Sequence, residues 1–282
     1  MLIAGIDSQW ALTLIQGATA EASRLHCDVT TTLIDQDGAE AAWLDRMLGR
    51  GSDGVIAAVT DLGPTAREAL AGRGLPLVLL DPVGASAGDT PTVSATNWAG
   101  GLAATEHLVG LGHTRIGIIT GPKNESCSAD RLDGYGAALR RAGLAIDLGL
   151  VRHGNSMIDG GRALGGKLLD LPLRPTAIFS CSDEQAYGVY QAAQDCGLRI
   201  PEDLSVVGFD DVNLCQWVSP QMTTVRQPLA EMGAVAVRQI AGRAGQGQPL
   251  GCFELPTELI VRASTAPPPK RAKEPRAPRD VE

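Results

Sequence analysis

The sequence has few aromatic residues and lacks the segments that direct a chain into a membrane. It holds three Phe, four Trp and three Tyr in 282 residues. No apolar run reaches the ~18 residues that a membrane-spanning helix needs. Met1 leads into an apolar segment without the basic region that begins a signal peptide. We therefore expect a cytoplasmic protein without a membrane partner.

Metal-binding patterns are also missing. No two of the six cysteines form a CxxC pair, and no two of the four histidines have ligand spacing on one helix face. The cysteines are scattered through apolar segments and are predicted to be buried free thiols. His113 lies in LGHTRIG, between a helix and a strand, and is expected to make a local hydrogen bond. No metal site and no cofactor is predicted.

Positive charge is scarce in the main body of the chain. The net charge is −8, and the stretch after Ala266 contributes five basic and three acidic residues, which leaves −10 for the rest. Duplex binding depends on neutralising phosphates, so an acidic body argues against direct DNA contact. Residues 266–282 are rich in proline and charge and poor in apolar side chains. They are predicted to be a disordered tail.

Three motif matches that would indicate an enzyme fail on their context. GASAG at 84–88 resembles a nucleophile elbow around Ser86, but no helical pattern follows it. GRGSDG at 49–54 follows a helix and opens a strand, the reverse of a dinucleotide-binding loop. Asp210 and Asp211 are adjacent, whereas glycoside hydrolysis needs two carboxyl groups facing each other across a bond. No catalytic residue and no enzyme activity is predicted.

Apolar runs alternate with helical patterns along most of the chain. Strands are predicted over 2–6, 29–34, 54–59, 76–80, 115–120 and 253–261, and helices over 12–25, 39–48, 98–111, 158–169 and 229–241, with a further helix from Pro64. Such alternation predicts parallel sheets. The predicted fold class is α/β, with two doubly wound, Rossmann-like lobes and a ligand cleft between them.

The stretch from Thr176 to Pro228 organises the second lobe. It reads as strand, helix and strand, with Gly197 as a helix C-cap. Its first strand ends at Ser182 and Asp183, and its second at Asp210 and Asp211. Ligands of open parallel sheets bind at the carboxyl ends of the strands. This stretch is therefore predicted to form half of a ligand crevice.

The same stretch resembles a known family. Gly197-Leu198, Ile200-Pro201, SVVGFDD and TTVRQP are similar to the core signature of LacI/GalR-type transcription regulators. The resemblance covers roughly 2–264 and implies a type I periplasmic-binding-protein fold. It implies a first lobe of 1–96 plus 228–251 and a second of 97–227 plus 252–265, with crossings near Ala95, Pro228 and Gly251.

The resemblance also implies a function. It identifies an effector-sensing domain that binds a sugar or oligosaccharide between the lobes, forms a homodimer and controls operator DNA through a helix-turn-helix head absent from this chain. The alternative is the solute-binding protein of a sugar transporter. Against it stand the missing signal segment, the unpaired cysteines and the match to SVVGFDD and TTVRQP.

Two charged residues lead the predicted ligand set. Asp210 is expected to accept hydrogen bonds from sugar hydroxyls, and the resemblance places it toward the ligand; the alternative is a loop cap. Arg131 is predicted one residue into a helix, an unfavourable place for a cation unless it serves a ligand. The alternative for Arg131 is a salt bridge to Asp130, to Asp133 or to an acid on the next element.

Six further residues complete the set. Ser182 and Asp183 contact the ligand or cap the next helix, and Asp81 contacts the ligand or forms a turn with Pro82. Trp10 is expected to cover an apolar sugar face, or else to pack against Leu14. The remaining predicted ligand-binding residues are Ser8 and Cys127.

Overall fold

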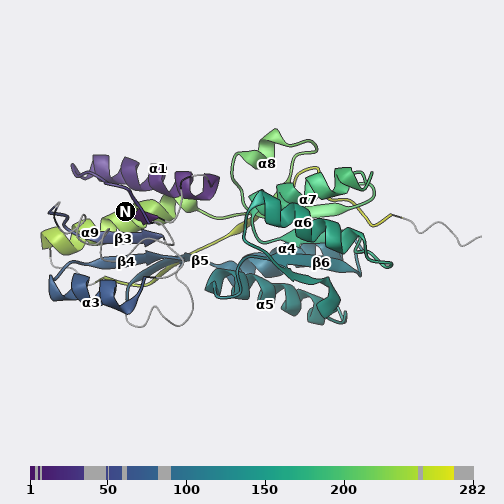
Figure 1. Ribbon diagram of the computed structural model, residues 1–282, viewed down its shortest axis with the longest axis horizontal. Coiled ribbons are helices and arrows are strands. Elements are labelled where there is room, and N and C mark those ends of the chain that lie inside the picture. Colours follow the sequence, from purple (N-terminus) through teal and green to yellow (C-terminus); the bar gives the residue numbers. More distant parts are fainter. Residues whose placement is uncertain are drawn as a thin grey trace, which may run out of the picture.

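The computed structural model describes residues 1–3, 6, 8–34, 49, 51–58, 62–81, 90–246 and 250–269. Two six-stranded sheets lie end to end, each covered by helices on both faces (Figure 1). We call the sheet that contains the N-terminus, with its helices, the first lobe, and the other the second lobe. The predicted helix over 39–48 and the Ser86 loop lie outside the described residues.

The first lobe has strand order β11-β5-β4-β3-β1-β2, and all its strand pairs are parallel. Its strands are β1 (Leu2–Ile3), β2 (Thr32–Leu33), β3 (Val55–Ala58), β4 (Leu77–Leu80), β5 (Thr92–Ala95) and β11 (Phe253–Leu255). The helices α1 (Gln9–Arg24) and α9 (Leu229–Gln246) cover one face, and α3 (Pro64–Gly72) covers the other (Figure 1). Pro64 begins α3 as predicted.

The second lobe repeats this plan with strand order β12-β10-β9-β8-β6-β7. Its strands are β6 (Ile116–Thr120), β7 (Val151–His153), β8 (Ala177–Ser180), β9 (Ser205–Asp210), β10 (Thr223–Arg226) and β12 (Glu258–Ile260), the last antiparallel. Its helices are α4 (Asn97–Gly110), α5 (Ser126–Arg141), α6 (Ile158–Leu169), α7 (Asp183–Asp195) and the short α8 (Leu214–Trp217). The predicted fold class, two doubly wound α/β lobes, is confirmed.

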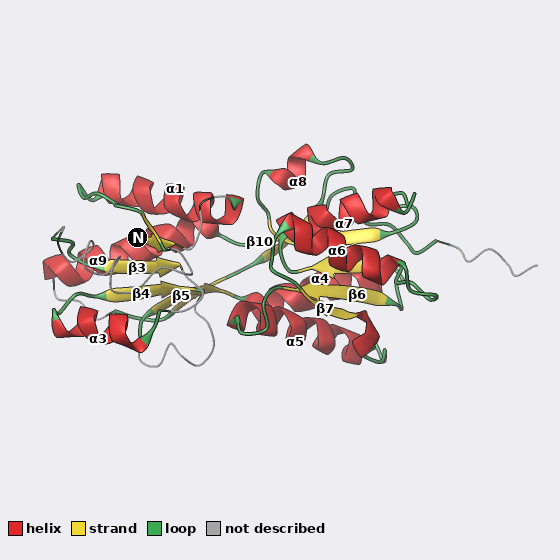
Figure 2. Ribbon diagram, viewed as in Figure 1, coloured by secondary structure: helices red, strands yellow, loops and turns green. Residues whose placement is uncertain are grey.

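The chain passes between the sheets three times, at the narrow waist of the molecule (Figure 2). The crossings lie between β5 and α4, between β10 and α9, and between β11 and β12. The single strand predicted over 253–261 is wrong, because Phe253–Leu255 pairs with β5 while Glu258–Ile260 pairs with β10. The third crossing therefore follows Leu255, and Phe253–Leu255 belongs with the first sheet. Thr257 and Thr96 join the first and third crossings, with 2.9 Å between their hydroxyl oxygens.

The predicted tail begins too early. The Ala266 carbonyl oxygen lies 2.9 Å from His113 Nε2 and 3.0 Å from Ser205 Oγ. The backbone N–H of Ala266 donates to the Ser205 hydroxyl. These bonds fix the chain against the second lobe at the residue where disorder was predicted. Of the described helices, none is both long and apolar enough to cross a membrane.

Paired glycines bring three pairs of helices into close contact. A Cβ on Gly161 of α6 would lie 2.0 Å from the Gln185 carbonyl oxygen of α7, and one on Gly188 of α7 would lie 2.1 Å from the Ile158 carbonyl oxygen of α6. Gly17 and Gly233 have the same relation between α1 and α9, and Gly101 and Gly134 between α4 and α5. The two helices of each pair therefore touch backbone to backbone.

Candidate ligand-binding site

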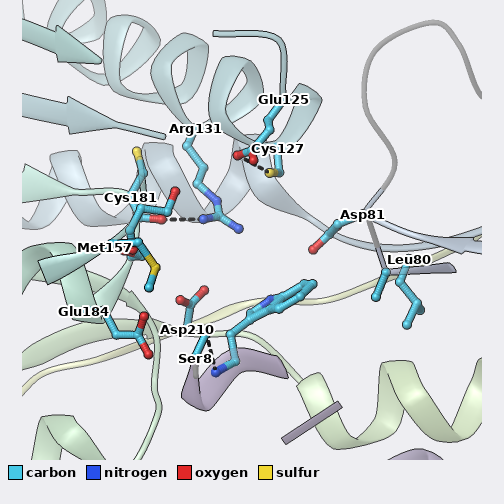
Figure 3. A pocket seen from close by; sticks show the side chains of 14 residues that line it. Ser8, Leu80, Asp81, Glu125, Cys127, Arg131, Met157, Cys181, Glu184 and Asp210 are labelled. Atoms are coloured by element: carbon cyan, nitrogen blue, oxygen red, sulfur yellow. Dashed lines mark hydrogen bonds between the residues drawn. The ribbon is translucent and has the colours of Figure 1, made fainter. Parts of the chain in front are cut away.

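A cavity of about 190 Å³ lies where the carboxyl ends of both sheets meet (Figure 3). Both lobes contribute side chains to its wall. The described residues that line it are Ser8, Trp10, Ala58, Leu80, Asp81, Glu125, Cys127, Arg131, Ser156, Met157, Cys181, Ser182, Glu184 and Asp210. Seven of the eight predicted ligand residues are in this group, and only Asp183 is outside it.

Arg131 is the one cationic side chain among the described lining residues. Its Nε donates to Asn97 Oδ1 at 2.9 Å, Nη1 donates to the Cys181 carbonyl at 2.5 Å, and the guanidinium stacks on the Phe209 ring at 3.7 Å. The helix begins at Ser126 rather than one residue before Arg131, so the predicted place at a helix N-terminus is wrong. The wall of the pocket fixes the guanidinium instead.

Asp210 ends β9 and lines the cavity, while its neighbour turns away. Gln227 donates Nε2 to Asp210 Oδ1 at 2.6 Å. Asp211 instead pairs with Arg226 at 2.8 Å and Arg262 at 2.6 Å. Burial raises the pKa of Asp210, and the charge of Arg131 opposes that rise. The two carboxyl groups diverge as predicted, which does not suit a hydrolase pair.

Asp81 ends β4 in the opposite lobe and faces Arg131 across the cavity (Figure 3). Its Oδ1 accepts weak bonds of 3.3 Å from the Ala95 N–H and the Asn97 amide. Its Oδ2 is buried and has no hydrogen-bond partner among the described residues. A buried oxygen without a partner is costly, so a donor from a ligand is the natural complement.

Sequence reasoning missed Asn97, the buried first residue of α4. Its side-chain oxygen accepts from Arg131 and its side-chain nitrogen donates to Asp81. One amide thus joins the charged groups of both lobes at the first crossing. Its place directly after a strand was visible in the sequence, but its partners come from distant segments.

Ser182 and Asp183 have different positions. Ser182 lines the cavity and also caps α7, because its Oγ accepts from the Gln185 N–H at 3.1 Å. Asp183 points into the protein, where it accepts from the Val212 N–H at 2.9 Å and the Thr224 hydroxyl at 2.5 Å. The next residue along a chain projects in a different direction, so a side chain beside a lining residue need not reach the cavity.

Asp183 makes stability depend on pH. Burial raises its pKa from 3.8 to about 7. Between these values the folded state holds a proton that the unfolded chain releases, so the free energy of unfolding falls as pH rises through this window. In Asp183→Asn, the free energy of unfolding should decrease across this window by on the order of 2 kcal/mol less than in the unchanged chain. Urea unfolding between pH 4.5 and 8 tests this, with Asp203→Asn, which changes a half-buried surface aspartate paired with Arg199, as control. An unchanged slope for Asp183→Asn would contradict it.

Trp10 and Ser8 lie at the start of α1. The Ser8 hydroxyl caps this helix by accepting from the Trp10 N–H at 3.2 Å. Trp10 lines the cavity and also packs on the first-lobe core that contains Leu14, so its two predicted environments are both present. Cys127 lies in the first turn of α5, where burial raises its pKa to about 12. That thiol is therefore not a reactive thiolate.

Two glutamates of the wall were also missed. Glu125 precedes α5, and its Oε2 accepts from Ser128 Oγ at 3.1 Å. Glu184 of the second lobe accepts from the Gln9 N–H of the first lobe at 2.9 Å, and the Gln9 side-chain oxygen accepts from the Leu214 N–H at 3.1 Å. These bonds hold the two lobes together beside the cavity.

The structure also places His113 and the six cysteines. His113 makes the local bonds expected of it, with 2.8 Å between Nδ1 and Thr176 Oγ1. All six cysteines are free thiols, but the predicted burial is wrong for Cys27, Cys196 and Cys252, which are exposed. Cys127 is partly buried, and only Cys181 and Cys215 are fully buried. Within the described residues, no group of three or more His, Cys, Asp and Glu side chains is arranged to hold a metal ion.

Fold and pocket together define a two-lobed binding protein of the periplasmic type. Residues 105–265 match the model of the periplasmic binding protein-like domain. The chain is 33% identical over 250 residues to the ribose operon repressor of Escherichia coli K12, covering 87% of this chain and 75% of that protein. It belongs to the LacI family of transcriptional regulators, within their effector-binding part.

Solved structures agree with this assignment. A LacI family regulator from Enterococcus faecium with bound ribose is 27% identical, with a TM-score of 0.85 over 94% of this chain and 97% of that one. The cellobiose complex of the regulator CelR is 28% identical, with a TM-score of 0.86 over 93% and 83%. The similarity is to transcriptional regulators, which favours the regulator over the transporter alternative.

Proposed function

We propose that the cavity binds a single small sugar and that the chain passes this signal to operator DNA through a DNA-binding segment of the intact regulator. One observation carries the proposal. Asp81 of one lobe, Arg131 and Asp210 of the other, and the Trp10 side chain line the same cavity. Carboxylates and a guanidinium suit sugar hydroxyls, and an indole suits the apolar face of a sugar ring.

The cavity favours one sugar ring over an oligosaccharide. Its volume of about 190 Å³ is smaller than the roughly 300–1,000 Å³ of pockets for drug-sized ligands. Ribose and cellobiose are bound by two similar regulators, which supports a saccharide as the class of effector. The proposal is for binding without catalysis, in the cytoplasm where operator DNA lies.

Closure of the lobes would carry the signal. A ligand that touches both lobes favours the closed arrangement, in which Gln9 bonds to Glu184 and Leu214. Effector and operator binding are then coupled reciprocally, typically by about 1–3 kcal/mol. The three crossings at the waist are where this movement would bend.

A sugar screen tests the proposal, with Trp10 as its probe. A thermal-shift screen of neutral mono- and disaccharides should yield at least one that raises the melting temperature. Trp10→Ala should remove most of that rise and weaken binding by about thirtyfold, equivalent to about 2 kcal/mol. Trp98→Ala, which changes an exposed tryptophan outside the cavity, serves as the control. A full ligand-induced rise in Trp10→Ala would contradict this role, and a screen without any hit would contradict sugar sensing.

A homodimer is part of the same proposal. A groove of about 880 Å³ beside α7 and α8 is lined by Tyr187, Leu198, Ile200, Trp217 and Pro220, among others, and Trp217 is 69% exposed. An exposed apolar groove of this kind suits a self-complementary contact with a second copy.

Sedimentation equilibrium tests the homodimer. Trp217→Glu should weaken dimerisation at least about tenfold, because it places a charge in an apolar contact. Leu148→Glu changes a residue that is 78% exposed elsewhere in the second lobe and should leave the dimer intact. Equal dimerisation of both variants would place the interface on another surface.

A further inference from the structure

The wall of the cavity carries far more negative than positive groups. Among the described lining residues, Asp81, Glu125, Glu184 and Asp210 are acids, and Arg131 is the sole cation. Figure 3 shows these five side chains arranged around one space, with the acids on several sides of it. A ligand that enters this space therefore meets acceptors almost everywhere.

The helix N-termini at the cavity are already supplied with carboxylates. Helix N-termini are the usual places where proteins bind phosphate. The first N–H of α1, that of Gln9, donates to Glu184. Helix α5 begins directly after Glu125, and the first turn of α7 contains Asp183 and Glu184. The N-terminus of α1 is thus occupied by a carboxylate and that of α7 by the Ser182 hydroxyl, while Glu125 places a negative charge beside the start of α5 without bonding to its backbone.

Part of the hydrogen-bonding capacity of Arg131 is already used within the protein. Its Nε and Nη1 donate to Asn97 and Cys181, so the fork that would grip a phosphate with two parallel bonds is partly used. Burial raises the pKa values of Asp81, Glu125 and Asp210. A carboxylate repels phosphate and a protonated acid is neutral, so neither form provides the missing positive charge.

One acceptor at the site, on Asp81, lacks a donor, so a ligand that carries a hydrogen-bond donor would complement it. Asp81 lines the cavity, and its Oδ2 is buried and has no partner among the described residues. A sugar hydroxyl can donate to it, whereas a phosphate or carboxylate group has only acceptors at neutral pH apart from a partly retained phosphate proton.

We infer that the cavity selects an uncharged, hydroxyl-bearing effector and excludes phosphorylated and carboxylated sugars. This inference rests on the proposed sugar-sensing function and narrows its ligand class. The acids Asp81 and Glu125 then act as specificity determinants, because they disfavour anionic relatives of the effector.

Matched pairs of ligands test the inference by titration calorimetry. Each sugar of the thermal-shift screen is compared with its phosphorylated form, including D-ribose with D-ribose 5-phosphate and D-glucose with D-glucose 6-phosphate. For the sugar that binds, the phosphorylated partner should bind at least about a hundredfold more weakly, as expected for like charges several ångströms apart at a partly buried site. A phosphorylated sugar that binds at least as tightly as its neutral partner overturns the inference and leaves sugar sensing in place. Failure of every sugar in both forms overturns the proposed function together with the inference.

A charge-neutralising variant identifies the source of the discrimination. Glu125→Gln should narrow the affinity ratio between neutral and phosphorylated sugar by about tenfold, because one repelling charge is lost. The matched control is Glu106→Gln, which removes the same charge from a side chain that pairs with Arg141 on the surface. The control should leave the ratio unchanged. An unaltered ratio in Glu125→Gln would overturn the assignment of this residue.

Discussion

Arg131→Ala is expected to abolish effector binding and to lower the free energy of unfolding by about 3–5 kcal/mol. Arg131 is only 6% exposed. Its guanidinium stacks on Phe209 and donates to Asn97 and Cys181. Its removal leaves two acceptors without donors, and Asp81 and Asp210 without a compensating charge. Because the side chain supports the fold as well as the pocket, the free energy of unfolding and the effector affinity should decrease together.

Two further variants separate these roles. Arg131→Lys keeps the charge but loses the planar fork and its stacking, so it should recover part of the stability and little of the affinity. Arg141→Ala, on the same helix, removes an exposed partner of Glu106 and should change stability by less than about 1 kcal/mol. Urea unfolding and calorimetry measure both properties. Normal sugar affinity in Arg131→Ala would show that the effector binds elsewhere.

Gly161→Ala should destabilise the second lobe by about 3 kcal/mol or more, although alanine normally favours a helix. The new Cβ would lie 2.0 Å from the backbone oxygen of Gln185, which cannot turn aside as a side-chain tip could. Helices α6 and α7 would have to separate and lose contacts along their length. The loss should appear in thermal unfolding of the chain without ligand.

The control lies in the same helix. A Cβ on Gly166 of α6 would meet nothing within 4 Å, so Gly166→Ala should stabilise the chain by roughly 0.5–1 kcal/mol. Both variants replace a glycine of α6 with alanine. Gly161 lies on the face that contacts α7, and Gly166 lies on a face without close neighbours. Similar effects at Gly161 and Gly166 would mean that α6 and α7 do not touch as closely as the structure has them.

The sequence determined the fold class and the edge of the sheets where the cavity lies. Alternation of strand and helix patterns is local, so it could be recognised without knowing what each element contacts. Polar residues that directly follow buried strands, such as Asp81, Ser182 and Asp210, can be placed at the cleft for the same reason. The family motifs around SVVGFDD added the two-lobed arrangement.

Only the tertiary structure decided which neighbouring side chain faces the cavity and which faces the core. Asp183 follows Ser182 but bonds to Val212 and Thr224, and Asp211 follows Asp210 but pairs with Arg226. A step of one residue changes the direction of a side chain, and its partners lie on elements that are distant in sequence.

Long-range contacts explain the other differences from prediction. Asn97 and Glu184 gain their positions from residues that fold against them from far along the chain, whereas Glu125 bonds locally to Ser128. The third crossing depends on β11 pairing with β5, some 160 residues earlier, which no local pattern between 253 and 261 reveals. Local periodicity fixes the elements, whereas the partners that surround each side chain exist only once both lobes have formed.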